Sequence, residues 1–218
     1  MGKLSELAFE EFCNAHAVQW EAIPTEHQAG TKTPDYFIYP AGIRVAAELK
    51  EVEPNAEERE QEQALQHNNF STLGCTVGDR ARDIINTAAK QLRVKAKGQC
   101  PALIVIHNPS WFLKHHTESH AIKAAMYGFD TIILGVSRHV HQKPIVLDRK
   151  SGPGRKMTDQ HNTSISAVAV LDERGLTVYH NVYAAIPLNP KLLTGVASRQ
   201  FTLGEKSLGE FVEWKEIV

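Results

Sequence analysis

Residues 33–50 read TPDYFIYPAGIRVAAELK, and this segment carries the strongest structural signal in the chain. The aromatic and β-branched run 36–39 is typical of a β-strand. The Pro-Ala-Gly sequence at 40–42 is typical of a turn, and residues 43–52 resume a strand pattern. We therefore expect a β-hairpin over residues 35–52.

Three charged residues fall in or beside this hairpin, namely Asp35, Glu48 and Lys50. Alternate side chains of a strand share one face, so Glu48 and Lys50 point the same way. Asp35 begins the neighbouring strand and can lie across from Glu48. The apolar residues that alternate with them are expected to face the core: Val45, Ala47 and Leu49. The sequence thus predicts that two carboxylates and one ammonium group converge.

This convergence has a chemical consequence, because two carboxylates about 4 Å apart repel by roughly 4 kcal/mol at an effective dielectric near 20. A divalent cation removes that repulsion, and Mg²⁺ is usually held by one or two carboxylates together with waters and substrate phosphates. Such an ion stabilises charge on a phosphoryl group and lowers the pKa of a bound water. Lys50 is placed to orient that water or to stabilise developing charge. We therefore expect Asp35 and Glu48 to bind Mg²⁺ or Mn²⁺, as phosphodiester hydrolysis requires.

The flanking sequence predicts further helices and strands. Apolar residues at helical spacing predict helices over 3–18, 79–97 and 116–127. Continuous apolar runs predict two strands covered on both faces, at 101–107 and 131–136, and later strands are expected at 145–147, 165–171 and 176–184. The polar stretch 54–72 is either a polar helix or a mobile excursion. This order predicts an α/β protein of the α+β type, with one mixed central β-sheet flanked by helices.

Composition narrows the class of protein. The 218 residues are 42% hydrophobic and 22% charged, which excludes a disordered or collagen-like chain. The uncharged stretch 98–113 is too short and too interrupted by proline to span a bilayer. The N-terminus lacks a secretory apolar run, and three widely spaced cysteines are typical of reduced thiols. We therefore expect a cytoplasmic protein that does not bind membranes.

The net charge of −1 conceals an asymmetry between the two parts of the chain. Residues 1–79 carry 14 acidic and 5 basic side chains, whereas residues 80–218 carry 11 acidic and 19 basic ones. Basic groups that gather on one surface can attract a polyanion even when the total charge is near zero.

Pro34-Asp35 followed by Glu48-Leu49-Lys50 resembles the motif of the PD-(D/E)XK nuclease superfamily, which has the restriction-endonuclease-like fold. The order of helix, motif-bearing hairpin, helix and further strands is also similar to that family over residues 1–136. The resemblance implies one nuclease-like domain over 1–218, with a core at about 1–136 and extra C-terminal strands at about 137–218.

The resemblance also implies roles for residues on two helices. An acidic residue of the first helix often joins the metal site in this family, and Glu6 stands at the expected place, with Glu11 and Glu10 as alternatives. A polar residue of the second helix often contacts the site, and Gln91 matches that position. The implied catalytic group is therefore Asp35, Glu48, Lys50, Glu6 and Gln91.

A nucleic-acid surface is expected on the helix at 79–97. Lys90, Arg93 and Lys97 are spaced three and four residues apart, so they can share one helix face and contact phosphates. The basic stretch 149–156 either closes over a nucleic-acid backbone or forms a mobile surface loop. The expected function is a metal-dependent nuclease acting on nucleic acid, with DNA as the expected substrate. The alternative is a catalytically silent nuclease-like module that binds nucleic acid or a protein partner.

Overall fold

The computed structural model describes residues 4–24, 34–67, 74, 76–96, 98–136, 143–151, 154–204 and 213–217. The α-helices are α1 (Leu4–Ala15), α2 (Ala56–Gln66), α3 (Asp79–Ala96) and α4 (Ser119–Tyr127), with 3₁₀ turns η1 (Pro40–Gly42), η2 (Lys114–His116) and η3 (Pro190–Leu193). The strands are β1 (Gln19–Ala22), β2 (Tyr36–Tyr39), β3 (Val45–Glu51), β4 (Ala102–His107), β5 (Asp130–Gly135), β6 (Ile145–Ser151), β7 (Ala167–Asp172), β8 (Gly175–His180), β9 (Arg199–Leu203) and β10 (Trp214–Ile217). Among the described helices, none is long and apolar enough to cross a bilayer.

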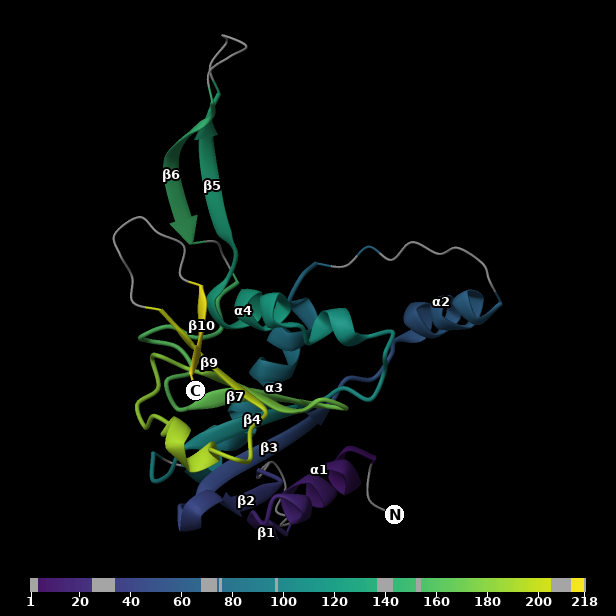
Figure 1. Ribbon diagram of the computed structural model, residues 1–218, viewed down its shortest axis with the longest axis vertical. Helices are drawn as coiled ribbons and strands as arrows, with labels where there is room; N and C mark the ends of the chain where they lie inside the picture. The colour runs from purple at the N-terminus through teal and green to yellow at the C-terminus, as the bar shows by residue number, and fades with distance from the viewer. Residues whose placement is uncertain are drawn as a thin grey trace.

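The protein is built on a mixed eight-stranded sheet in the order β1-β2-β3-β4-β7-β8-β9-β10. Strands β3, β4 and β7 run parallel, as do β8 and β9, and the remaining neighbours are antiparallel. Figure 1 shows α1 on one side of this sheet and α3 and α4 on the other. The predicted mixed sheet flanked by helices is confirmed.

Each face of the sheet buries its own apolar cluster, and we name the faces after the helices that cover them. On the α3 face, Ile104 and Ile106 pack with α3 residues such as Leu92. On the α1 face, Leu103 and Val105 pack with Phe9. Burial on both faces explains why β4 is a continuous apolar run, as the sequence predicted.

The hairpin at 35–52 is confirmed as the antiparallel pair β2 and β3, joined by η1. The polar stretch after it contains the helix α2, so the helical alternative is correct for residues 56–66. Asn55 caps this helix by accepting from the Glu58 N–H, and the Glu58 carboxylate accepts from the Asn55 N–H. This reciprocal capping box was visible in the sequence as Asn-x-x-Glu.

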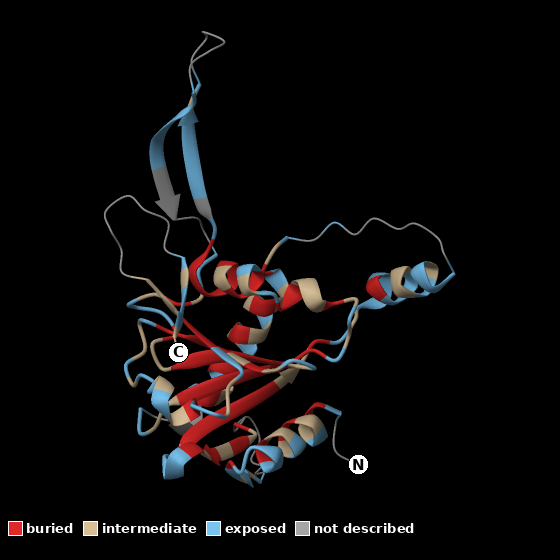
Figure 2. Ribbon diagram, in the orientation of Figure 1, coloured by how far each residue is buried: buried red, intermediate tan, exposed pale blue. Residues whose placement is uncertain are grey.

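The strand expected at 131–136 is present as β5, but its expected burial is wrong. Among the described strands, β5 pairs with β6 alone, in a separate two-stranded sheet, and its residues from Thr131 to Leu134 are exposed. Figure 2 shows this ribbon as pale blue and standing away from the body. The apolar run indicated burial, but it did not specify a layer to pack against.

The apolar spacing of the first helix put Leu4 and Leu7 on its buried face, and this expectation is wrong. Leu4 and Leu7 are 60% and 50% exposed, and the buried residues are instead Ser5, Phe9 and Cys13. Helical periodicity was compatible with burial of either of two adjacent faces of this helix. Packing against the sheet buries the face that carries Phe9.

The part of the chain after residue 136 contributes to the middle of the sheet. Strand β7 lies between β4 and β8, and the parallel register of β4 with β7 aligns Ile104 with Val168. Strands β1, β9 and β10 lack a clear apolar alternation, and the sequence did not indicate them.

Candidate functional site

The register of the β2–β3 hairpin brings the three predicted site residues to one place. Tyr36 pairs with Ala47, so one more step along the antiparallel register sets Asp35 level with Glu48. The turn η1 that fixes this register contains Ala41 and Gly42 at φ +48° and +76°. Directly opposed residues of an antiparallel pair share a face, so Asp35 and Glu48 both belong to the α3 face.

A backbone hydrogen bond fixes the position of Asp35. The Leu49 N–H donates to Asp35 Oδ2 at 2.8 Å. This bond ties the carboxylate to the strand that carries Glu48, one residue away from it. The predicted convergence of Asp35 with Glu48 is therefore present in the structure.

Glu48 is a fully buried carboxylate at 0% exposure. Its Oε1 accepts from Lys50 Nζ, whereas its Oε2 has no hydrogen-bond partner among the described residues. Burial raises the pKa of Glu48 to about 7 and the charge of Asp35 adds to this shift, whereas the Lys50 ammonium and a backbone hydrogen bond from Asp35 oppose it. A buried acceptor without a donor is costly, so this oxygen is placed to receive a cation or a proton.

Lys50 lies between Glu48 and solvent, with its side chain 24% exposed. An ammonium group has three N–H donors, and the contact with Glu48 Oε1 uses one of them. Lys50 is therefore oriented by Glu48 and keeps donors for a further acceptor.

These residues fit a hard divalent cation as ligands. Asp35 and Glu48 supply two carboxylates, and the unpartnered Glu48 Oε2 is an oxygen of the type that Mg²⁺ and Mn²⁺ bind. No group of three or more His, Cys, Asp or Glu side chains in the described ranges is arranged to hold a metal. The remaining coordination would therefore come from water and substrate, as is usual for Mg²⁺.

The acidic residues of α1 lie on the helix that covers the opposite face of the sheet. Tyr36 Oη donates to Glu10 Oε1 at 2.9 Å, so Glu10 is engaged away from Glu48. Burial and then Glu10 raise the pKa of Tyr36, and the nearby charges of Glu6 and Asp35 add to the shift. Glu6 is half-buried and its charge acts on Tyr36, the residue next to Asp35, whereas Glu11 is exposed. Of the three alternatives, Glu6 stays the expected contributor.

The helix α3 packs on the same face of the sheet as Glu48. The structure describes the side chains of only some of its predicted nucleic-acid-binding residues. Gln91 is half-buried, and Lys90 is exposed. Arg93 is exposed and donates to Asn162 Oδ1 at 3.4 Å, so part of its hydrogen-bonding capacity is used within the protein. Lys97 lies outside the described residues.

Sequence reasoning missed a buried polar cluster beside the end of β3. Glu58 Oε1 accepts from His116 Nε2 at 3.0 Å, and Glu58 Oε2 accepts from Arg80. Burial raises the pKa of Glu58, but the Asn55 N–H, His116 and Arg80 outweigh it and hold that pKa below its usual value. The capping-box spacing marked Glu58, but nothing in the sequence indicated its distant partners. This cluster joins α2 to α3 and η2.

Glu58→Gln is expected to lower the free energy of unfolding at pH 7 by about 2 kcal/mol, because charge-assisted hydrogen bonds to Arg80 and His116 are lost. The folded-state pKa of Glu58 lies below its unfolded value, so this stabilisation is present above about pH 4.3 and disappears as pH falls through the folded pKa. Urea unfolding at pH 7 and pH 3 measures both effects. Glu57→Gln, in the same helical turn but exposed, is the matched control. An equal loss in both variants, or no loss at pH 7, would contradict the assignment.

A separate pocket of about 320 Å³ lies on the same face of the sheet, between the start of α4, the β7–β8 turn and β9. The register across the sheet aligns Lys50 with Ile106, Val170 and Thr177, and Thr177 lines this pocket. At about 4.8 Å per strand, three spacings put it roughly 14 Å from Lys50.

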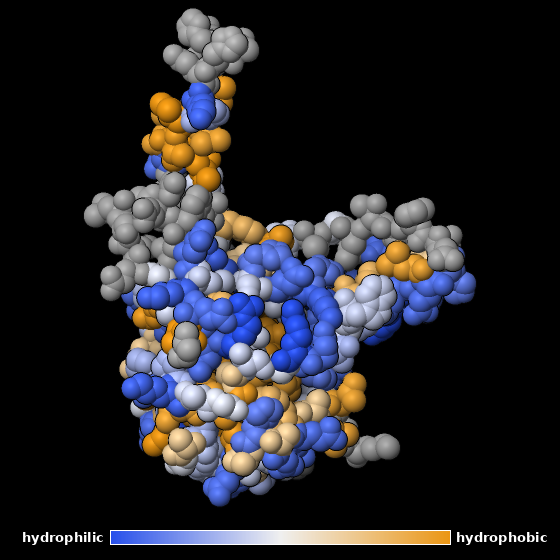
Figure 3. All heavy atoms as spheres, viewed as in Figure 1, coloured by the Kyte–Doolittle hydropathy of each residue, from blue (hydrophilic) through white to orange (hydrophobic). Residues whose placement is uncertain are grey.

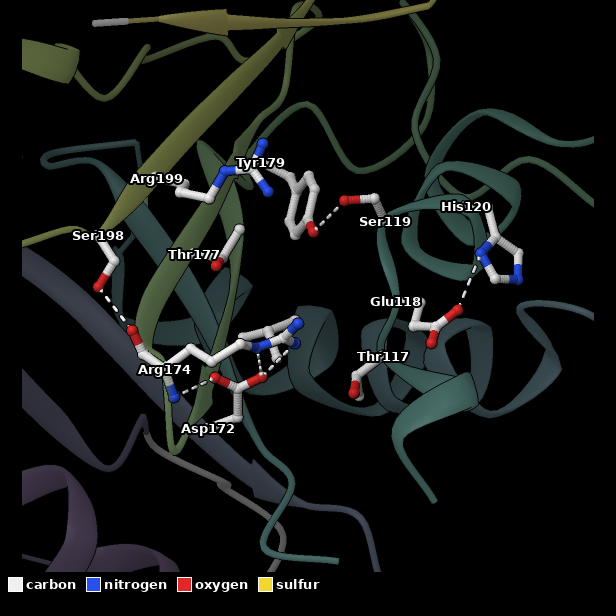
Figure 4. Close-up of a pocket in the computed structure, with 11 residues that line it drawn as sticks. Thr117, Glu118, Ser119, His120, Asp172, Arg174, Thr177, Tyr179, Ser198 and Arg199 are labelled. Carbon is white, nitrogen blue, oxygen red and sulfur yellow. Dashed lines mark hydrogen bonds and ion pairs between the residues drawn. The ribbon is translucent and has the colours of Figure 1, made fainter. Parts of the chain in front are cut away.

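Figure 4 shows how the charged side chains of this pocket lie: Arg174 meets Asp172, and His120 meets Glu118. Arg199 forms an ion pair with Glu216. Both arginines are thus already paired with carboxylates, and the pocket chiefly offers hydroxyl groups. It has no excess of positive charge that would by itself select a polyanion.

Comparison of the chain with models of protein families, with curated proteins and with solved structures finds no match.

Proposed function

We propose that this protein is a metal-dependent nuclease that hydrolyses phosphodiester bonds, with Asp35, Glu48 and Lys50 at its catalytic centre. The observation that carries the proposal is a buried carboxylate, Glu48, that shares one oxygen with Lys50 and has no partner for the other. A solvent-facing Glu–Lys pair on an edge strand would not have these properties, since β3 is an interior strand of the sheet.

Asp35 and Glu48 would hold the Mg²⁺ or Mn²⁺ ion. When bound, such an ion supplies charge stabilisation at a phosphoryl group and a water of lowered pKa. The protein contributes a fixed ligand geometry, because the Leu49 N–H holds Asp35 and the strand holds Glu48.

Lys50 is proposed to contact the substrate or the attacking water. Its ammonium is oriented by Glu48 and reaches solvent, so its remaining N–H groups can donate to a phosphate oxygen or to the attacking water. A preorganised donor of this kind stabilises charge that develops in the transition state. Glu6 and Gln91 are proposed as supporting residues that act through water or the phosphate.

The proposed substrate is nucleic acid, with DNA as the expected class. Lys90 is exposed on α3, the helix that packs against the strand carrying Glu48, and Arg93 lies one turn further on. Each phosphate that such residues neutralise makes binding more sensitive to salt.

The test incubates the protein with plasmid, single-stranded DNA and RNA, with and without Mg²⁺ or Mn²⁺. We expect cleavage of at least one substrate that requires the divalent ion and is lost in Asp35→Asn. Cleavage that is equal in Asp35→Asn and the wild type would refute the site. Salt-sensitive binding without cleavage, under every ion tested, would instead identify a catalytically silent nucleic-acid-binding module.

A further inference from the structure

The β5–β6 arm, made of the strands β5 and β6 and the adjoining Val136, gathers exposed apolar side chains in one place. Its seven large aliphatic side chains are each 38–75% exposed: Ile132, Ile133, Leu134, Val136, Ile145, Val146 and Leu147. Figure 3 shows orange spheres gathered on this projecting arm, with some blue ones among them. Contiguous exposed apolar surface of this kind marks an interaction site.

A two-stranded arm of this kind is not expected to be stable without further packing. A two-stranded ribbon is marginally stable in water, and three or more strands with a hydrophobic face are needed for independent stability. Aliphatic side chains are somewhat smaller than aromatic ones that bury 150–250 Å², so seven of them at about half exposure present roughly 600 Å². Only about half of that area belongs to β5 and Val136, so association through β5 buries less than the ~800 Å² that each partner buries in a standard interface.

The two edges of the arm differ in a way that selects the strand that pairs. Pro144 precedes β6, an irregularity interrupts its register with β5 between Ile133 and Leu134, and its sequence carries charges at 148–150. Proline, bulges and charges are the features that block pairing at an edge. The β5 stretch from Thr131 to Gly135 contains neither a charge nor a proline. None of the described strands pairs with its other edge.

We propose that two copies of the chain associate through their arms, with β5 of one copy pairing antiparallel to β5 of the other about a two-fold axis near Ile133. The result is a four-stranded sheet in the order β6-β5-β5-β6. In this register Ile133 faces its own counterpart and Ile132 faces Leu134, so no like charges are opposed. Residues 131–135 carry no basic side chain for a phosphate backbone, which favours a second copy over nucleic acid as the occupant. This inference does not depend on the proposed nuclease activity.

Sedimentation velocity from about 1 to 100 μM tests the association. We expect a monomer–dimer equilibrium in the micromolar range, because the apolar area is at the low end for a stable interface. Ile133→Lys places two ammonium groups opposite each other and should raise the dissociation constant at least tenfold. The matched control is Ile43→Lys, an exposed isoleucine in the turn between β2 and β3, which should dimerise like the wild type. A wild type that stays monomeric, or an unchanged constant in Ile133→Lys, overturns the proposal.

A cysteine cross-link tests the register and distinguishes the two edges. Ile133→Cys should form a disulfide-linked dimer under mild oxidation, whereas Ile145→Cys on β6 should add none beyond the parent chain. Equal cross-linking of both variants would overturn β5–β5 pairing. A monomeric wild type whose binding to duplex DNA is weakened by Ile133→Lys would assign the arm to nucleic acid and refute the dimer. Circular dichroism confirms that each variant is folded.

Discussion

Lys50→Ala is expected to lower the rate of phosphodiester cleavage by about 10²- to 10³-fold, the usual cost of removing one preorganised donor from a catalytic site. Lys50 is held by Glu48 Oε1 and retains donors towards solvent, so its loss removes charge stabilisation without removing the carboxylates. Substrate binding should change far less than the rate, because one contact among many to the backbone is lost. Single-turnover cleavage with saturating protein measures the chemical step.

Two variants control this experiment. Lys50→Met keeps the aliphatic stem that packs beside Glu48 and should lose activity as Lys50→Ala does. Lys215→Ala removes an exposed lysine of β10 and should cleave at the wild-type rate. If Lys50→Met retains full activity, Lys50 has no catalytic role.

Gly78→Ala is expected to lower the free energy of unfolding by about 3 kcal/mol. Gly78 has φ +80° and precedes α3, and a Cβ there would lie 2.7 Å from the Ala121 carbonyl oxygen and 3.0 Å from the Ala125 nitrogen. These are backbone atoms of α4, so they cannot rotate away, and relief requires α3 and α4 to separate. The left-handed conformation costs about 1–2 kcal/mol, and overpacking adds about 1–3 kcal/mol.

Thermal unfolding measures this effect, with an expected fall in Tm of roughly 6–12 °C for a chain of this size. Gly42→Ala is the matched control, because Gly42 has φ +76° but nothing lies within 4 Å of the added Cβ. It should lose only the conformational part, about 1–2 kcal/mol. Equal losses in the two variants would show that the close approach of α3 to α4 is not limiting.

The sequence predicted the hairpin and its three charged residues because the relevant signals are local. The turn at 40–42 and the alternation in β3 together determine the register, and the register brings Asp35 level with Glu48. The full burial of Glu48 could not be predicted in this way, since it depends on α3 and on β4, which arrive later in the chain.

Sequence patterns predicted burial and long-range contacts less reliably, because these depend on segments distant in the chain. The run at 131–136 resembles 101–107 in apolar content, yet β4 lies in the centre of the sheet and β5 in an exposed ribbon. Composition measures the tendency to be buried, but it does not specify the surface that does the burying. Glu58 shows the same limit, because its local cap was readable while its contacts with Arg80 and His116 cross more than 20 residues.

The central claim is that Asp35 and Glu48 together bind one divalent cation, and calorimetric titration with Mn²⁺ tests it most directly. Asp35→Asn removes a charge but leaves an amide oxygen for the Leu49 N–H, and Glu48→Gln preserves the size of the buried side chain. We expect one ion per chain in the wild type and in Glu57→Gln, and at least tenfold weaker binding in Asp35→Asn and in Glu48→Gln. Binding of the same stoichiometry and affinity in all four proteins, or no binding to the wild type, would contradict the account.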